Sequence, residues 1–234
     1  PGHAEAWAAR SQFLGSVGRL NEAVIDARKA KSLDPLSPGI RDHYITVLAM
    51  AGQLAAAEAE LAEAERLWPG ATSVVQARYR LHLRHGDAGE ALRLLRSGAV
   101  ETAGARLQGP FLVARIDPSE ENVEAVVRLG RNIIREKPAG VTGHSQTLAE
   151  FDRTDELFRL LMSSRHPDTV GRIVDVMFRP AFADLHRDPR FIQAAARFGL
   201  VSYWQATGKW PDFCLEPDLP YDCRSAARAV AAGA

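Results

Sequence analysis

The hydrophobic positions of this chain follow a helical period along most of its length. Between residues 54 and 68 the apolar positions step by three or four, which places them on one face of a helix. The same stretch consists almost entirely of Ala, Glu, Leu and Arg, which are strong helix formers. The pattern therefore predicts an amphipathic helix here and an all-α fold for the chain.

Three residue types also recur in phase with a period of 34 residues. Such a period indicates one helical unit copied along the chain. The glycine turns the chain between two helices, the alanine lets the helices approach closely, and the proline stops the second helix. The positions concerned are Pro1, Pro35 and Pro69, then Gly18, Gly52 and Gly86, and finally Ala23, Ala57 and Ala91.

A 34-residue helical hairpin of this kind resembles the tetratricopeptide repeat, and the first unit resembles it best. The residues that match are Trp7, Ser11, Leu14, Gly18, Ala23, Ala27, Ala30 and Pro35. The resemblance implies a right-handed superhelix of about five hairpins, with a concave face that holds a peptide. We expect three units in residues 1–98, at about 4–36, 38–70 and 72–98, and diverged hairpins in 99–166.

The period fades after residue 98. Gly104, Gly109 and Pro110 predict a short helix followed by a connection. A helix capped by Ser119 should then run to Pro138, as Asn21 should cap the second helix of the first unit. A further hairpin is expected over 142–151 and 154–164.

Residues 167–234 are predicted to form a compact cap over the open end of the array, followed by a cysteine-containing tail. Helices are expected over 168–178, 189–198, 200–207 and 225–232. Aromatic side chains at Phe198, Tyr203, Trp204 and Trp210 suit an end cap. The stretch from Leu185 to Cys214 is similar to the tail of bacterial multidomain proteins in which such repeats follow a winged-helix regulator or a nucleotide-cyclase domain.

The composition of the chain argues against two classes of partner, nucleic acids and membranes. The chain carries 29 basic and 29 acidic residues, and zero net charge argues against nonspecific nucleic-acid binding. No apolar run is long enough to insert into a membrane. Because Pro1 occupies the last position of a repeat, we expect a fragment of a larger protein. Its location is left open: cytoplasmic, or periplasmic if a membrane span precedes it.

No catalytic residue, metal site or cofactor is predicted. His82 and His85 lie one helical turn apart but lack the carboxylate and the supporting hydrogen bonds that accompany two histidines in a metal site. Two cysteines are too few for a zinc site. The segment from Gly143 to Thr147 begins like a nucleophile elbow but lacks its second glycine. Cys214 and Cys223 can close a disulfide in an oxidising compartment or remain thiols in the cytosol.

The first helix of each unit should line the concave face. Arg80 and Arg84, one helical turn apart, can clamp a carboxylate, or they pair with acidic neighbours instead. The lysines and asparagines of chaperone-binding relatives are replaced at every matching position, which disfavours a chaperone adaptor. The predicted peptide-binding residues are Gln12, Asp42, His43, Thr46, Met50, Gln76, Arg80, Leu83 and Arg84.

The sequence thus predicts a noncatalytic module of a larger bacterial regulatory protein that binds a protein or peptide, or associates with itself. The alternative is a small-ligand sensor with a pocket between the array and the cap. That pocket is expected near Phe191, Phe198, Tyr203 and Trp204.

Overall fold

A computed structural model describes residues 2–100, 102, 104–163, 174 and 176–232 of the chain. All regular secondary structure in this part of the chain is helical, which confirms the all-α prediction. None of its helices is long and apolar enough to cross a membrane. The first ten α-helices are α1 (Ala4–Ser16), α2 (Leu20–Leu33), α3 (Pro38–Met50), α4 (Leu54–Leu67), α5 (Thr72–Arg84), α6 (Ala88–Arg96), α7 (Ala105–Ile116), α8 (Glu120–Glu136), α9 (Val141–Glu150) and α10 (Thr154–Ser163).

Shorter elements connect or follow these helices. A 3-10 turn, η1 (Pro138–Gly140), joins α8 to α9. The C-terminal elements are η2 (Pro180–Phe182), α12 (Ala183–His186), α13 (Arg190–Arg197), α14 (Leu200–Thr207), η3 (Asp212–Leu215) and α15 (Cys223–Ala232). The helix expected over 168–178 lies largely outside the described residues.

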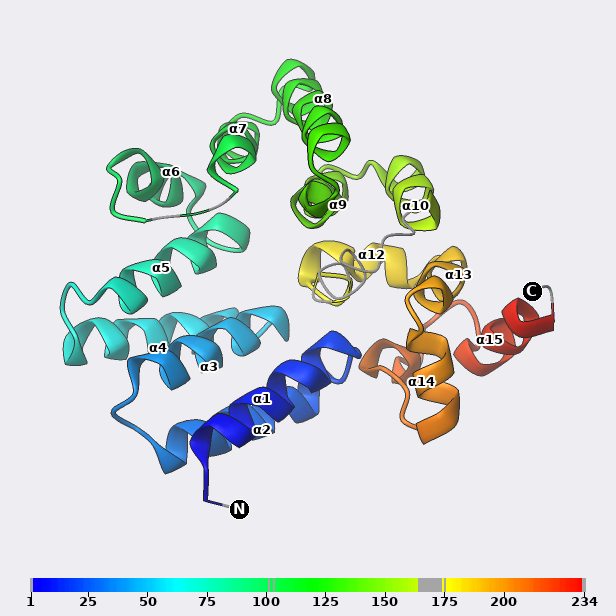
Figure 1. Cartoon of the computed structure of the whole chain (residues 1–234), viewed down its shortest axis with the longest axis horizontal. Coiled ribbons are helices and arrows are strands. Elements are labelled where there is room, and N and C mark those ends of the chain that lie inside the picture. The colour runs from blue at the N-terminus through cyan, green and yellow to red at the C-terminus, as the bar shows by residue number, and fades with distance from the viewer. Residues whose placement is uncertain (1, 101, 103, 164–173, 175, 233–234) are drawn as a thin grey trace.

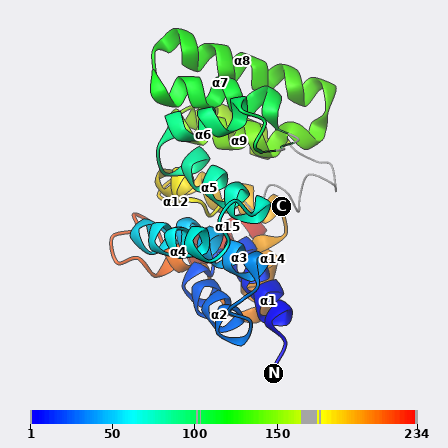
Figure 2. The same cartoon turned by 90° about the vertical axis from the view of Figure 1, so that its left-hand side faces the viewer.

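Neighbouring helices pack in pairs. α1 packs on α2, α3 on α4, α5 on α6, α7 on α8 and α9 on α10, and the pairs follow one another along an arc (Figures 1 and 2). Each of the three units expected before residue 98 holds one pair. Gly18 and Gly52 take left-handed φ values of 82° and 72° between the helices of their pairs. Asp152 adopts the same conformation, with φ 56°, between α9 and α10.

The prediction of a short helix and a connection around Pro110 is wrong. α7 runs unbroken from Ala105 to Ile116 with Pro110 inside it. Proline removes one backbone donor, but Phe111 and Leu112 are almost fully buried where α7 packs on α6 and α8. The apolar burial of this face outweighs the lost hydrogen bond.

Two predicted helix caps are also wrong. Ser119 stands at the start of α8, but its side chain accepts no hydrogen bond from the helix. Asn21 lies inside α2, which begins at Leu20 and has no capping side chain in its own segment. The missing acceptor comes from the other end of the chain: the Oδ2 atom of Asp212 accepts a hydrogen bond of 2.8 Å from the backbone N–H of Asn21.

The C-terminal region therefore does more than cover the last helices. The backbone N–H of Asp212 donates to the Gly18 carbonyl at 2.9 Å, and the Trp204 indole N–H donates to the Val17 carbonyl at 3.0 Å. Because α13 packs on α10, the same region contacts both the last pair and the first (Figure 1). The sequence predicts an open array with an end cap, whereas the two ends meet and close a ring.

Residues 176–189, which precede α13, lie inside this ring (Figure 1). η2 packs on α9, while the ring of Phe178 lies against Gly18 at the α1–α2 turn. His186 is sandwiched in an aromatic cluster, stacked on Phe213 at 4.5 Å and edge-on to Phe191 at 4.6 Å. Its Nε2 atom lies 2.8 Å from the Met177 carbonyl, which suits the tautomer that donates from Nε2.

Cys214 and Cys223 form a disulfide with Cα atoms 5.8 Å apart. The bond ties η3, which carries Asp212 and Phe213, to the first residue of α15. It therefore braces the segment that caps α2.

The contact of the C-terminal region with Gly18 predicts that Gly18 and Gly52, which occupy matching positions of two repeats, differ in how much stability is lost on substitution. Gly18→Ala and Gly52→Ala both place a side chain at positive φ, which costs about 1–2 kcal/mol. At Gly18 the new Cβ would also lie 2.6 Å from both Phe178 and Pro211, whereas at Gly52 it meets nothing within 4 Å. We expect Gly18→Ala to lose a further 1–3 kcal/mol, roughly, of unfolding free energy in denaturant titrations. Equal losses would contradict the closed ring.

Because the imidazole of His186 is buried, we expect the unfolding free energy of the protein to fall in acid. Burial lowers the pKa of this imidazole to about 4, whereas the unfolded side chain titrates near 6.5. The unfolded state therefore binds the proton first, and the stability present above pH 6.5 is lost as the pH falls towards 4. Urea titrations at pH 7 and pH 5 should show that the wild type loses about 2 kcal/mol more than His186→Gln does over this interval. An identical loss in the two proteins would contradict the burial of a neutral imidazole.

The disulfide predicts that protein denatured without reductant exposes no titratable thiol. Reduction, or Cys214→Ser with Cys223→Ser, should lower the unfolding free energy by about 2–3 kcal/mol because the nine-residue loop is no longer closed. Two reactive thiols in the unreduced protein would contradict the bond.

Candidate binding pocket on the inner face

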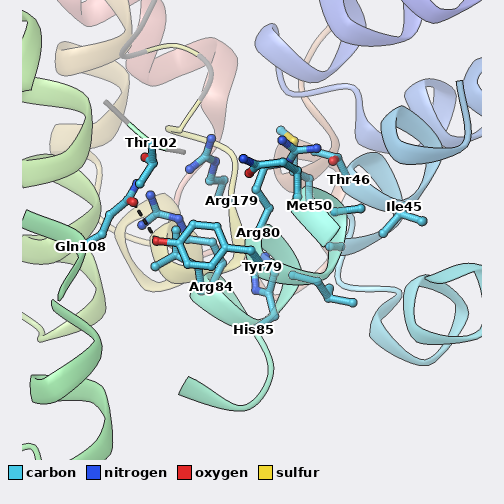
Figure 3. A pocket seen from close by; sticks show the side chains of 15 residues that line it. Ile45, Thr46, Met50, Tyr79, Arg80, Arg84, His85, Thr102, Gln108 and Arg179 are labelled. Carbon is cyan, nitrogen blue, oxygen red and sulfur yellow. Dashed lines mark hydrogen bonds between the residues drawn. The ribbon is translucent and has the colours of Figure 1, made fainter. Parts of the chain in front are cut away.

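A cavity of about 360 Å³ lies where α3, α5 and α7 face Arg179, which directly precedes η2 (Figure 3). Its wall combines side chains from the repeats with side chains that are far away in the sequence. The lining residues are Ile45, Thr46, Ala49, Met50, Gln76, Ala77, Tyr79, Arg80, Leu81, Leu83, Arg84, His85, Thr102, Gln108 and Arg179.

Six of the nine predicted peptide-binding residues line this pocket. Four of them occupy matching positions of successive repeats, Thr46 with Arg80 and Met50 with Arg84, since 80 − 46 = 34 and 84 − 50 = 34. Six of the fifteen residues that line the pocket were therefore predicted from the sequence. The six are Thr46, Met50, Gln76, Arg80, Leu83 and Arg84.

The other three predicted residues lie outside the pocket lining. Asp42 forms an ion pair with Arg80 across α3 and α5, so Arg80 does pair with an acidic neighbour. Gln12 is exposed on α1. His43 is half-buried, its Nε2 atom has no hydrogen-bond partner within the described part of the chain, and burial lowers the pKa of its imidazole.

The pocket has two chemically different sides. α3 contributes the apolar side chains of Ile45, Ala49 and Met50. Polar groups of Tyr79, Thr102 and Gln108 gather on the side towards α7, beside Arg84 and Arg179 (Figure 3). A ligand in this cavity would meet aliphatic surface on one side and cationic donors on the other.

Arg84 is the cation whose charge is least balanced. Among the described residues it forms no ion pair or hydrogen bond, and its guanidinium lies 5.5 Å from the centroid of the Phe111 ring. Burial, with the charge of Arg179, lowers its pKa to about 9, so the group remains protonated at neutral pH. A partly buried cation that forms no ion pair of its own favours an anion beside it.

The nearest acidic group is already engaged. Glu150 accepts from the Arg115 Nε atom at 2.9 Å, and burial raises the pKa of its carboxyl. Arg115 also donates to the carbonyls of His82 and Leu83, at 2.9 and 3.1 Å, and so satisfies the C-terminal end of α5. Because Glu150 is ion-paired with Arg115, its charge offsets that of Arg84 only in part.

Two neighbours of Arg84 are held neutral. Burial, assisted by the charges of Arg179 and Arg84, lowers the pKa of His85 to about 4. Burial raises the pKa of Tyr79 to about 12, and its hydroxyl donates to the Gln108 Oε1 atom at 2.7 Å. The positive potential of the pocket therefore comes from its arginines.

Sequence reasoning missed five polar lining residues. Tyr79 occupies the position of a large core residue in its repeat, so nothing in the sequence indicated that its hydroxyl would lie in a binding site. Arg179 reaches the pocket because the chain returns through the ring, where its guanidinium also donates to Gln146 of α9 at 3.2 Å. No local pattern signals such a residue. The missed residues are Tyr79, His85, Thr102, Gln108 and Arg179.

The weaker motifs of the sequence have structural roles. His82 accepts a hydrogen bond from the Asp87 backbone N–H at 3.2 Å, and the described residues contain no cluster of three potential metal-ligating side chains. His144 and Ser145 are buried within α9 rather than raised on a turn. Of the aromatic residues expected around a small-ligand pocket, Phe191 and Trp204 are fully buried in the core.

The sequence matches no protein-family model and no curated protein.

Proposed function

We propose that this chain is a noncatalytic interaction module of a larger bacterial regulatory protein, built from tetratricopeptide-like helical pairs stacked as a right-handed superhelix. Its inner-face pocket holds part of a protein or peptide partner. The observation that carries the proposal is the convergence of register-matched side chains on one cavity: Thr46 with Arg80, and Met50 with Arg84. Repeated helical pairs present such surfaces to extended or helical peptides.

A small-ligand sensor is the second candidate, and one observation favours it. Arg179 encloses the pocket from the C-terminal side, so the cavity lies between the repeats and the C-terminal region. This is the arrangement expected of a sensor, although it lies away from Phe191 and Trp204. Its volume of about 360 Å³ is near the lower end of small-molecule sites, which span roughly 300–1,000 Å³.

Charge reversal in the pocket tests the interaction module. Peptides selected from a random display library against the wild-type protein should lose roughly tenfold or more in affinity for Arg80→Glu with Arg84→Glu, because two guanidinium donors are replaced by carboxylates. The exposed Arg80–Asp42 pair contributes little to stability, whereas Arg84 packs over Phe111, so affinities are measured below the melting temperature of the double variant. Isothermal calorimetry with each peptide provides the affinities.

The matched control is Arg66→Glu with Arg93→Glu. These two exposed arginines each pair with a glutamate three residues earlier, on α4 and α6, and neither lines the pocket. The control carries the same change in net charge and should bind the selected peptides as the wild type does. Failure to select any peptide, or equal binding by the pocket variant, would contradict the proposal.

A further inference from the structure

The charge balance of the pocket points to one class of ligand. Arg80 is paired with Asp42, and Arg115 is paired with Glu150. Arg84 has no such partner among the described residues, and Arg179 lies on the same side of the cavity (Figure 3). The polar side therefore offers one guanidinium charge that a single anionic group would balance.

The opposite side of the cavity adds a second requirement. Ile45, Ala49 and Met50 from α3 present hydrocarbon surface that a ligand can cover. Covering it is favourable because apolar area is removed from water. A purely polar anion such as inorganic phosphate would leave this wall unused.

Resting on the binding function proposed above, we infer that the pocket binds a carboxylate that carries a short apolar group. The carboxylate pairs with the Arg84 guanidinium, with Arg179 beside it, and the apolar group lies against Ile45 and Met50 of α3. Guanidinium and carboxylate match as planar, bidentate partners. The cavity, at about 360 Å³, accommodates a small molecule or the end of a peptide rather than a folded segment.

Two sources supply this chemistry: the C-terminal residue of a peptide partner and a free organic acid. The probes are an N-acetylated tetrapeptide of three alanines and a final leucine with a free carboxyl terminus, and 4-methylpentanoate as the free acid. The C-terminal amide of the same peptide and 4-methylpentanamide are the uncharged counterparts. Isothermal calorimetry and thermal shift measure binding of all four to the full chain.

Binding of either carboxylate, with its amide roughly tenfold weaker or more, is the expected result. Arg84→Gln should remove that difference, whereas Arg66→Gln, at an exposed position of α4, should leave it intact. Preference for the tetrapeptide identifies a peptide C-terminus as the source, and preference for 4-methylpentanoate identifies a free acid; both support the inference.

A second variant guards against a folding defect in Arg84→Gln. Met50→Glu places a negative charge at the last residue of α3, beside the expected carboxylate, and should weaken carboxylate binding without touching Arg84. Its matched control is Ser16→Glu, at the equivalent position one repeat earlier (50 − 16 = 34), which does not line the pocket.

The inference is overturned if neither carboxylate binds at millimolar concentration, if the amides bind equally well, or if neither Arg84→Gln nor Met50→Glu weakens binding. These results differ from failure of the interaction module itself. Library peptides that bind the pocket with amidated C-termini would preserve the module while excluding the carboxylate site. A library that yields no binder contradicts the module, whatever the two acids do.

Discussion

The contact between the α1–α2 turn and the C-terminal segment is the constraint on which the rest of this structure depends. Asp212 both donates to the Gly18 carbonyl and caps the start of α2, while Trp204 donates to the Val17 carbonyl. These groups are helix-end donors and acceptors that water would otherwise satisfy. Gly18 is required twice: its left-handed φ turns the chain, and its missing Cβ leaves room for Phe178 and Pro211.

Closing the ring fixes the inner face as well as the ends. Phe178 packs against Gly18, and the next residue, Arg179, bonds Gln146 of α9 and lines the pocket. The same backbone segment thus transmits the position of the first helical pair to one wall of the cavity. An open array of helical pairs presents a continuous groove to a partner. Here part of that inner surface is covered by the chain itself, and a bounded pocket lies beside the covered part.

The electrostatics of the pocket show why a neutral chain can hold a charged site. Overall charge sums to zero, and two of the arginines at the pocket, Arg80 and Arg115, have carboxylate partners. Burial then determines which of the titratable side chains in the pocket carry a charge. His85 is held neutral and Tyr79 is held protonated, whereas Arg84 stays cationic even with its pKa lowered to about 9. Local pairing, not composition, decides the sign of the potential that a ligand meets.

Features that depend on neighbouring residues could be predicted from the sequence. It predicted the helical class, the paired helices before residue 98, and the α9–α10 pair, because helical periodicity is a short-range property. The predictions were wrong where contacts between residues far apart in the sequence override local signals. Pro110 lies inside α7, and α2 is capped by Asp212 instead of Asn21. Repeat register also placed Thr46, Arg80 and Arg84 on one surface. Only the tertiary structure closed the ring and brought Arg179 and Gln108 to the pocket, because the return of the chain through its own interior has no signature in local spacing.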